Sequence, residues 1–347
     1  MSKGGTKYKT RSALLIRAGH NVRTHQVRCR TVDVAVKALW WNKHHAEKLD
    51  VWRGGLSLPS LGLGPARWDS LAGGQAANVI IHAGATVHWT KCYEVLEAAN
   101  VGSTVDLLLL AIKLPCMRFL YITGGRPWGS FEETDVVKEL SVTDAIPYSQ
   151  TKLVAEAVVR RAAGCSPSKT GRLKVLNPGW VIGTSDEGIS DTRDSIWRLV
   201  ATCIKIGAYN ASEADGWLFI SDVTTTATTI IDTALGTEVK GNVTEYPVDG
   251  ITWREIWSIL EDLGYMLQGK TTAEWLALVR VDMDAEKETH PLWPLAHMIE
   301  GFQNDRRIAN LSPDKRVRTP LRLKRAIARS AEFLVRVVFL PTSPSMR

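Results

Sequence analysis

Apolar and polar positions in the first half of the chain predict strands and helices in alternation. Short apolar runs that end at Gly or Pro indicate buried strands, and apolar residues spaced three and four apart indicate helices. The expected strands are 25–30, 78–82, 118–123 and 173–176, and the expected helices are 34–48, 91–112 and 149–163, with 12–18 ending a further helix. This order between residue 11 and about 182 predicts an α/β fold with a doubly wound parallel sheet.

The second half of the chain has a different pattern. Helical spacing dominates at 195–206, 253–263, 272–281, 292–299 and 321–338, with short strands at 217–220 and 244–248. We therefore expect two parts, a sheet domain over 1–185 and a smaller, mostly helical lobe over 186–347. Such a lobe would close over a substrate crevice at the carboxyl edge of the sheet.

Composition narrows the possible partners. The 347 residues carry a net charge of +7. The basic stretches 3–30 and 315–325 lack the aromatic interleaving of a nucleic-acid site, so no nucleic acid is expected. The longest apolar run, Val105 to Ile112, is short of the ~20 residues of a membrane helix, so no membrane is expected either.

Cysteine and histidine usage argues against disulfides and metals. The cysteines are scattered, odd in number and never spaced C-x-x-C, which favours a reduced, cytoplasmic compartment. His44 and His45 are adjacent and have no ligand spacing, so we expect no metal site.

The strongest chemical signal is the pair Tyr148 and Lys152. The two residues are four positions apart at the start of a predicted helix, so their side chains project from one face. An ammonium near a phenol lowers the phenol's pKa and lets it act as a general acid toward a carbonyl oxygen. The alternative is an ordinary surface pair at the same helical spacing. It is the weaker interpretation, because this helix follows a predicted strand, as a catalytic helix of a parallel-sheet fold would.

Two further segments fit carbonyl chemistry. Thr123 ends a predicted strand, where its hydroxyl could bond a substrate carbonyl beside Tyr148. An ordinary strand threonine explains it equally well. After the strand 173–176, Pro178 turns the chain and Gly179 allows close approach of backbone to a flat ring such as nicotinamide.

With these residues in place, the chain resembles the extended short-chain dehydrogenase/reductase class. More narrowly, it resembles the terminal thioester reductase domains of fungal nonribosomal peptide synthetases and the related carboxylic acid reductases. The resemblance runs from about residue 11 to 344. It is carried by the segments 82–89 (HAGATVHW), 100–104 (NVGST), 147–152 (PYSQTK), 177–183 (NPGWVIG), 197–200 (WRLV), 206–209 (IGAY), 249–255 (DGITWRE) and 290–295 (HPLWPL).

The resemblance implies a Rossmann-like domain and an NADP(H)-dependent oxidoreductase of secondary-metabolite biosynthesis. Its substrate would be an acyl thioester on the phosphopantetheine arm of an acyl or peptidyl carrier protein, or a carbonyl derived from it, reduced to aldehyde or alcohol. Thr123, Tyr148 and Lys152 would be catalytic, with Asn100 supporting a proton-relay water. The cofactor would be bound by Gly4, Arg30, Gly84, Ala85, Pro178 and Gly179.

The N-terminal segment departs from the family pattern. Of the Gly-rich turn that cradles the cofactor pyrophosphate, only Gly4 matches. Only Met1 and Ser2 precede the matching segment 3–11, so the first strand is expected to be missing. Gly55 replaces the family's Asp near the adenine, and an alternative register puts Gly124, not Thr123, at the usual hydroxyl position. A second hypothesis is therefore a truncated or degenerate domain that binds a carrier protein without cofactor. A sugar epimerase or dehydratase is a weaker third.

Overall fold

The computed structural model describes residues 13–16, 36, 42–88, 90–124, 137–138, 141, 146–165, 171–236, 244–245, 249–296, 299 and 319–343. The chain forms two compact units, Met1–Asn177 with Thr229–Tyr246 and Pro178–Thr228 with Pro247–Arg347. This division differs from the expected single boundary at residue 185. The chain leaves unit 1 after Asn177 and later returns to it through one helix and one strand.

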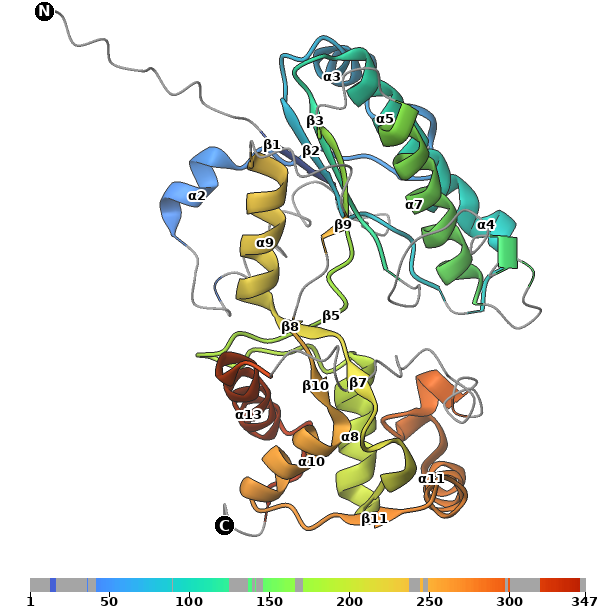
Figure 1. Ribbon diagram of the computed structural model, residues 1–347, viewed down its shortest axis with the longest axis vertical. Helices are drawn as coiled ribbons and strands as arrows, with labels where there is room; N and C mark the ends of the chain where they lie inside the picture. The colour runs from blue at the N-terminus through green and yellow to red at the C-terminus, as the bar shows by residue number, and fades with distance from the viewer. Residues whose placement is uncertain are drawn as a thin grey trace, which may run out of the picture. The chain divides into compact units, whose positions relative to one another are not determined.

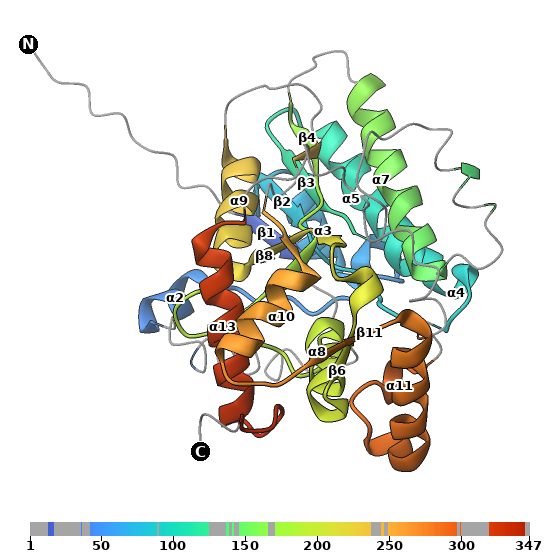
Figure 2. The ribbon, with the colours of Figure 1, turned by 60° about the horizontal axis from the view of Figure 1, so that its bottom comes forward.

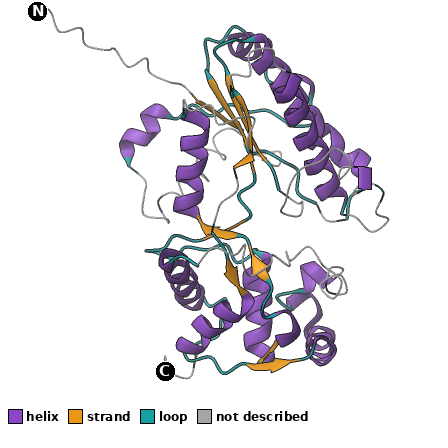
Figure 3. Cartoon of the chain, in the orientation of Figure 1, coloured by secondary structure: helices purple, strands orange, loops and turns teal. Residues whose placement is uncertain are grey.

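Unit 1 is built on a parallel sheet (Figures 1 and 3). Its five strands lie in the order β1 (Ala13–Ile16), β2 (Val79–His82), β3 (Arg118–Ile122), β4 (Leu173–Leu176) and β9 (Thr244–Glu245), each parallel to its neighbour. The expected strands 78–82, 118–123 and 173–176 are confirmed, and so is the α/β class with its parallel sheet. The expected strand 25–30 lies outside the described residues.

Strand β1 corrects one expectation from the sequence, whereas the strand expected to be missing would precede Gly4, outside the described residues. Residues 13–16 were expected within the end of a helix. Instead Ala13–Ile16 pairs with Val79–His82 along its whole length. The backbone of β1 forms hydrogen bonds with β2, whose backbone groups would otherwise lie at an open edge. Strand β2 therefore has a strand on both sides.

Strand β9 is a second correction, because 244–248 was assigned to the C-terminal lobe. Thr244–Glu245 instead pairs with Val175 and Leu176 and extends the sheet of unit 1. A two-residue strand carries too little periodicity to show which sheet it joins.

The helices of unit 1 cover both faces of the sheet. Those within unit 1 are α2 (Lys43–Lys48), η1 (Pro59–Gly62), α3 (Pro65–Ala72), α4 (Tyr93–Glu97), the π turn η2 (Ala98–Gly102), α5 (Ser103–Lys113) and α7 (Pro147–Cys165), together with the second half of α9 (Val223–Leu235). Helices α5 and α7 pack on one face, and α9 on the other (Figure 1). The expected helices 91–112 and 149–163 are confirmed, whereas α3 and α9 were not predicted.

Side-chain alternation along the strands builds two cores. Phe119 and Tyr121 of β3 face α5 and α7, whereas Leu120 between them faces α9. This is the period-two alternation of a strand buried on both faces.

The segment Tyr93–Lys113 is one continuous helix that contains the π turn. By length and composition it is apolar enough to cross a membrane, so the expectation that no segment reaches that level is wrong. In the fold this segment packs against the sheet through Leu107, Leu108 and Ala111. A core helix of this kind passes the same test as a membrane span.

Unit 2 is mostly helical. Its helices are α8 (Ser195–Ile206), η3 (Ala211–Glu213), α10 (Trp253–Asp262), α11 (Thr272–Glu286), η4 (Lys287–Thr289), η5 (Trp293–Leu295) and α13 (Leu321–Arg336), with the first half of α9. Its strands form pairs, β10 (Ile251–Thr252) with β7 (Trp217–Leu218), β11 (Gln268–Lys270) with β6 (Ala208–Asn210), and β5 (Trp180–Ile182) with β8 (Ile220–Asp222). Helices α10 and α13 lie side by side (Figure 2).

Capping explains why the helices of unit 2 begin where the sequence predicts. Thr252 and Thr271 each form a capping box, with Glu255 and Glu274 respectively. Helix α8 ends at Gly207, whose φ of 65° is the left-handed C-cap conformation. The expected helix 292–299 instead starts as the short 3-10 turn η5, where Pro294 lacks the N–H that a helix interior needs.

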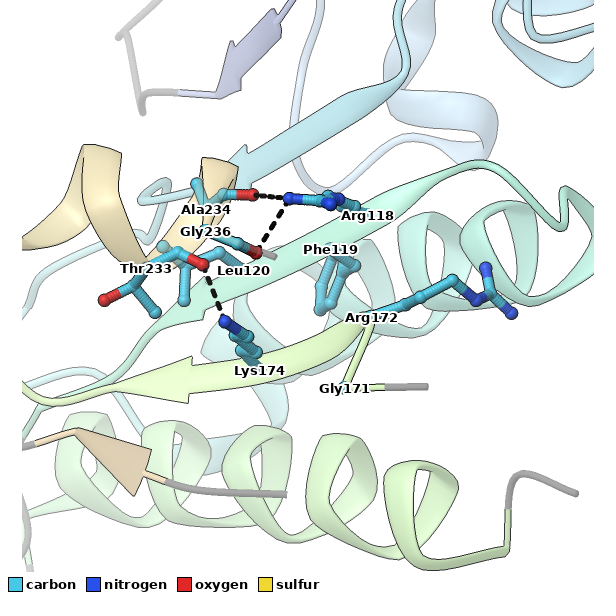
Figure 4. Close-up of a pocket in the computed structure, with 9 residues that line it drawn as sticks. All are labelled: Arg118, Phe119, Leu120, Gly171, Arg172, Lys174, Thr233, Ala234 and Gly236. Atoms are coloured by element: carbon cyan, nitrogen blue, oxygen red, sulfur yellow. Dashed lines mark hydrogen bonds between the residues drawn. The ribbon is translucent and has the colours of Figure 1, made fainter. Parts of the chain in front are cut away.

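Cations at the start of the strands hold the helix ends of unit 1 in place. Arg118 Nη1 donates to the carbonyl oxygens of Ala234, Leu235 and Gly236 at 3.4, 2.6 and 2.9 Å. Lys174 Nζ donates to the Thr233 carbonyl at 3.0 Å. All of these residues except Leu235 line one pocket (Figure 4). Cations at a helix C-terminus satisfy its last carbonyls and offset its dipole.

Replacing Arg118 with Met is expected to lower the free energy of unfolding by about 1–3 kcal/mol, because the α9 carbonyls lose a charged donor. Urea unfolding followed by circular dichroism measures this change. The control is Arg329→Met, which removes only an exposed ion pair with Glu332, for a loss of about 0–1 kcal/mol. Equal effects of the two substitutions would contradict the capping role.

Candidate active site

The sequence-predicted residues Tyr148, Lys152, Thr123 and Asn100 all belong to unit 1. Helix α7 starts at Pro147, a residue suited to the first helical position, so Tyr148 and Lys152 occupy its first two turns. Thr123 directly follows β3, and Asn100 lies in the π turn before α5. The carboxyl end of a parallel sheet is where such folds bind ligands.

Lys152 is buried and its ammonium is directed at the end of β3. Its Nζ donates to the Ile122 carbonyl oxygen at 2.8 Å and lies 4.3 Å from the centre of the Tyr121 ring. Burial lowers the pKa of Lys152 to about 7, and the negative charge of Glu156 opposes that shift. The ammonium is therefore near its titration point at neutral pH.

Tyr148 differs from the sequence expectation in the direction of its pKa. A neighbouring ammonium was expected to lower it, but burial raises the pKa of the Tyr148 phenol above its ordinary value. The cause is desolvation, which disfavours the phenolate. The phenol thus keeps its proton at neutral pH, as a general acid must before it reacts.

Thr123 is tied to a residue that the sequence analysis did not identify. Its hydroxyl donates to Glu156 Oε2 at 2.8 Å, and its backbone N–H donates to the Leu176 carbonyl at 2.9 Å. Glu156 is fully buried and its Oε1 also accepts from Arg160 Nε at 2.8 Å. The expected oxyanion role needs the same hydroxyl proton that Thr123 gives to Glu156.

Asn100 joins the loop after β2 to the start of α7. Its Oδ1 accepts from the Thr86 N–H at 2.6 Å, and its Nδ2 donates to the Thr86 carbonyl at 3.1 Å and to Thr151 Oγ1 at 2.9 Å. Thr151 Oγ1 in turn donates to the Tyr148 carbonyl at 2.8 Å. The π turn presents Asn100 for these bonds, and such turns are frequent at functional sites.

His82 forms a buried polar cluster with Ser103 and Thr104. Its Nε2 lies 3.1 Å from Thr104 Oγ1 and 3.3 Å from Ser103 Oγ, and its ring centre is 5.6 Å from that of Tyr121. Burial, followed by the charge of Lys152, lowers the pKa of His82 to about 3. His82 is therefore neutral at physiological pH.

The expected cofactor residues fall in different parts of the chain. A Cβ on Gly84 would lie 3.1 Å from Ile16 Cγ2, so packing against β1 and Leu56 favours glycine there. Ala85 follows it in the loop after β2. Pro178 and Gly179 belong to unit 2, where Gly179 has a φ of 65° and a Cβ would lie 2.5 Å from the Phe219 oxygen. Gly4 and Arg30 lie outside the described residues.

Two functional candidates, Glu156 and His82, were missed by the sequence analysis. Glu156 could have been found, because it lies four positions after Lys152 and therefore on the same helix face. His82 gave only the weak signal of a polar residue at the end of a buried strand. Among the described residues no cluster of His, Cys, Asp and Glu suits a metal ion.

Comparison with known proteins places residues 6–230 in the family model described as male sterility protein, an NAD-binding family. Among curated proteins, peramine synthetase ppzA of Metarhizium majus is 42% identical over 92% of this chain and 12% of its own length. D-lysergyl-peptide-synthetase subunit 3 of Claviceps purpurea is 40% identical over 91% of this chain and 18% of its own length. The chain thus spans less than a fifth of these relatives.

Solved structures agree with the fold. The PhqB reductase domain of Penicillium fellutanum superposes with a TM-score of 0.73 at 28% identity, over 94% of this chain and 85% of that one. The terminal R domain of the myxalamid pathway gives the same TM-score of 0.73 at 22% identity, over 96% of this chain and 86% of that one.

The lowered pKa of His82 predicts that acid destabilises the fold. The unfolded chain binds a proton at the ordinary pKa of 6.5 and the folded chain only at about 3. The stability that comes from burying a neutral His82 is therefore fully present above pH 6.5 and is lost as the pH falls from 6.5 toward 3. In His82→Gln, the unfolding free energy should fall less between pH 7 and pH 4 than in the parent. The exposed His44→Gln is the control, and parallel curves for His82→Gln and the parent would contradict the prediction.

Proposed function

The chain belongs to the male sterility protein family of NAD-binding domains, and from that premise we propose that it is an NADPH-dependent reductase of acyl thioesters. The observation that carries the proposal is the placing of Tyr148 and the buried Lys152 at the start of α7, next to the carboxyl end of β3. Similar curated proteins are named peramine synthetase and D-lysergyl-peptide-synthetase. A carrier-bound thioester, or a carbonyl released from it, is the corresponding substrate.

The residues described fit the nicotinamide end of such a cofactor. An ammonium has three N–H donors, and the hydrogen bond from Lys152 to the Ile122 carbonyl uses one of them. The others suit ribose hydroxyls. Gly84 and Ala85 supply the loop beside β1. Pro178 and Gly179 are proposed as the nicotinamide contact from the sequence alone. Gly4 and Arg30 are proposed for the phosphates from the sequence alone.

The cofactor, when bound, supplies the hydride that reduces the thioester carbonyl. The protein contributes a proton: Tyr148, which holds its proton because burial raises its pKa, donates it to the carbonyl oxygen. Lys152 favours the phenolate that remains. The hemithioacetal then releases the carrier thiol and leaves an aldehyde, and a second reduction would give the alcohol. Asn100 holds the start of α7 in register and is proposed for the proton relay. Thr123 stays proposed from the sequence as a partner of the substrate oxygen, a role that requires its hydroxyl proton to turn away from Glu156.

The proposed partner is an acyl or peptidyl carrier protein with its phosphopantetheine-bound substrate. The proposed setting is fungal secondary-metabolite biosynthesis. A cytoplasmic location is proposed because the cysteines are scattered, as in proteins of a reducing compartment. Among the described residues Cys92, Cys116, Cys165 and Cys203 are not in disulfides.

Cofactor binding is the first test. We expect the chain to bind NADPH more tightly than NADH in calorimetry, because Arg30 is proposed to meet the 2′-phosphate. Arg30→Gln should weaken NADPH binding by about tenfold or more, the usual effect of losing a charged hydrogen bond, and leave NADH binding unchanged. A folded protein that binds a carrier protein but no NADPH at millimolar concentration would instead favour the alternative, a carrier-binding domain without cofactor.

Tyr148→Phe is expected to reduce turnover of an acyl-pantetheine thioester by about 10²–10⁴-fold, because the positioned acid is lost. The rate is followed by the decrease in NADPH absorbance, and circular dichroism checks the fold. Tyr93→Phe on the neighbouring helix α4 removes the same hydroxyl outside the proposed site and should keep parental turnover. Unchanged turnover in Tyr148→Phe would overturn the catalytic assignment.

A further inference from the structure

Glu156 is a fully buried carboxylate that the proposed reaction does not yet use. Burying a charge is costly unless it is paired and hydrogen-bonded. Glu156 meets this requirement through the Thr123 hydroxyl on one oxygen and Arg160 on the other. The arrangement ties the centre of α7 to the end of β3.

Lys152 and Glu156 hold consecutive residues of the same strand end. Lys152 donates to the carbonyl of Ile122, and Glu156 accepts from the hydroxyl of Thr123. Because the two side chains are four positions apart on α7, they lie on one helix face, with Arg160 one turn further. Positive, negative and positive charges thus follow one another along this face.

We propose that Glu156 is a positioning residue of the active site, whose carboxylate fixes the Thr123 hydroxyl and keeps the Lys152 ammonium charged. The inference rests on the proposed function, since it concerns the protonation state of a proposed catalytic residue. Glu156 acts through Thr123 and Lys152 and needs no contact with substrate.

Among the described residues, Glu156 is the negatively charged group next to Lys152, because the other groups that face Lys152 are neutral. Tyr121 of β3 is neutral, because burial raises its pKa well above the ordinary value. Tyr148 is neutral for the same reason, and His82 of β2 is neutral because its pKa is lowered to about 3. The Coulomb effect of Glu156 is the one that raises the pKa of Lys152.

The remaining ionisable side chains on the elements packed against α7 are exposed or bonded elsewhere. Arg118 of β3 and Lys174 of β4 bond the end of α9, and Asp106 of α5 accepts from the Ser60 N–H. Exposed or half-exposed positions on α4 and α5 hold Tyr93, Glu94, Glu97 and Lys113.

The decisive variant is Glu156→Gln, which keeps the side chain's shape and removes its charge. The reaction needs Lys152 charged, so activity falls at high pH as the ammonium loses its proton. Loss of an opposite charge at this range moves a pKa by about one unit or more. We therefore expect the alkaline limb of the kcat/KM profile to move to lower pH by about one unit. Glu97→Gln, the same change at an exposed position on α4, should not move it. A limb unmoved in Glu156→Gln would overturn the proposal.

Two further variants separate charge from hydrogen bonding. Glu156→Asp keeps the charge and should restore the alkaline limb to near its parental position, and it serves where Glu156→Gln folds poorly. Thr123→Val removes the hydroxyl and keeps the carboxylate, so activity should fall while the limb stays in place. A limb shifted equally in Thr123→Val and Glu156→Gln would show that packing, not charge, is responsible and would contradict the proposal.

Stability against pH gives a readout that does not depend on turnover. The folded pKa of Lys152 is about 7 and its ordinary value is 10.5. The unfolded chain binds more protons between these values, so the unfolding free energy rises with pH across the window. In Glu156→Gln the rise should begin at lower pH. An inactive parent would refute the proposed function alone, whereas identical stability curves for parent and variant would refute the role of Glu156.

Discussion

The burial of one ammonium, that of Lys152, is the constraint on which the rest of unit 1 depends. An unpaired charge in a protein interior is costly, and each neighbour of Lys152 offsets part of that cost. The Ile122 carbonyl accepts its hydrogen bond, the Tyr121 ring presents its face, and Glu156 supplies the opposite charge. These contacts need β3 and α7 at one separation and one register. Packing of the helix on the sheet is thereby linked to the protonation state of the site.

The same requirement, that buried polar groups find partners, sets the position of the residues around Lys152. Asn100 bonds the loop after β2 through Thr86 and bonds α7 through Thr151. A π turn in the preceding helix costs some regular hydrogen bonding, but it places the Asn100 amide where both partners are within reach. The segment that carries Tyr148 is thus held by a hydrogen bond from a residue 51 positions away.

Sequence was sufficient where local pattern and tertiary packing agree. The helix that carries Tyr148 and Lys152 and the strand 173–176 were predicted because spacing, flanking Pro and Gly and apolar runs all act within a few residues. Residues 13–16 were misassigned because four apolar residues suit either a helix or a strand, and pairing with β2 decides between them. Helix α9 was missed because its Thr-rich sequence is a poor helix former, and contacts with Arg118 and the sheet stabilise it. Glu156 was missed because a glutamate in a helix is usually exposed, and only its spacing from Lys152 indicated otherwise.

The order of the two acidities in the site decides which way a proton moves. Burial raises the pKa of the Tyr148 phenol above its ordinary 10 and lowers that of the Lys152 ammonium to about 7. In the proposed reaction Tyr148 gives its proton to the substrate oxygen and becomes a phenolate. Proton return from Lys152 to that phenolate is then downhill, because the ammonium is the stronger acid. Stronger desolvation of Lys152 would increase this driving force but would leave less of the ammonium protonated. The charge of Glu156 raises the pKa of Lys152 and so keeps more of the ammonium protonated. The buried carboxylate thereby sets the balance between the driving force for proton return and the protonated fraction of Lys152.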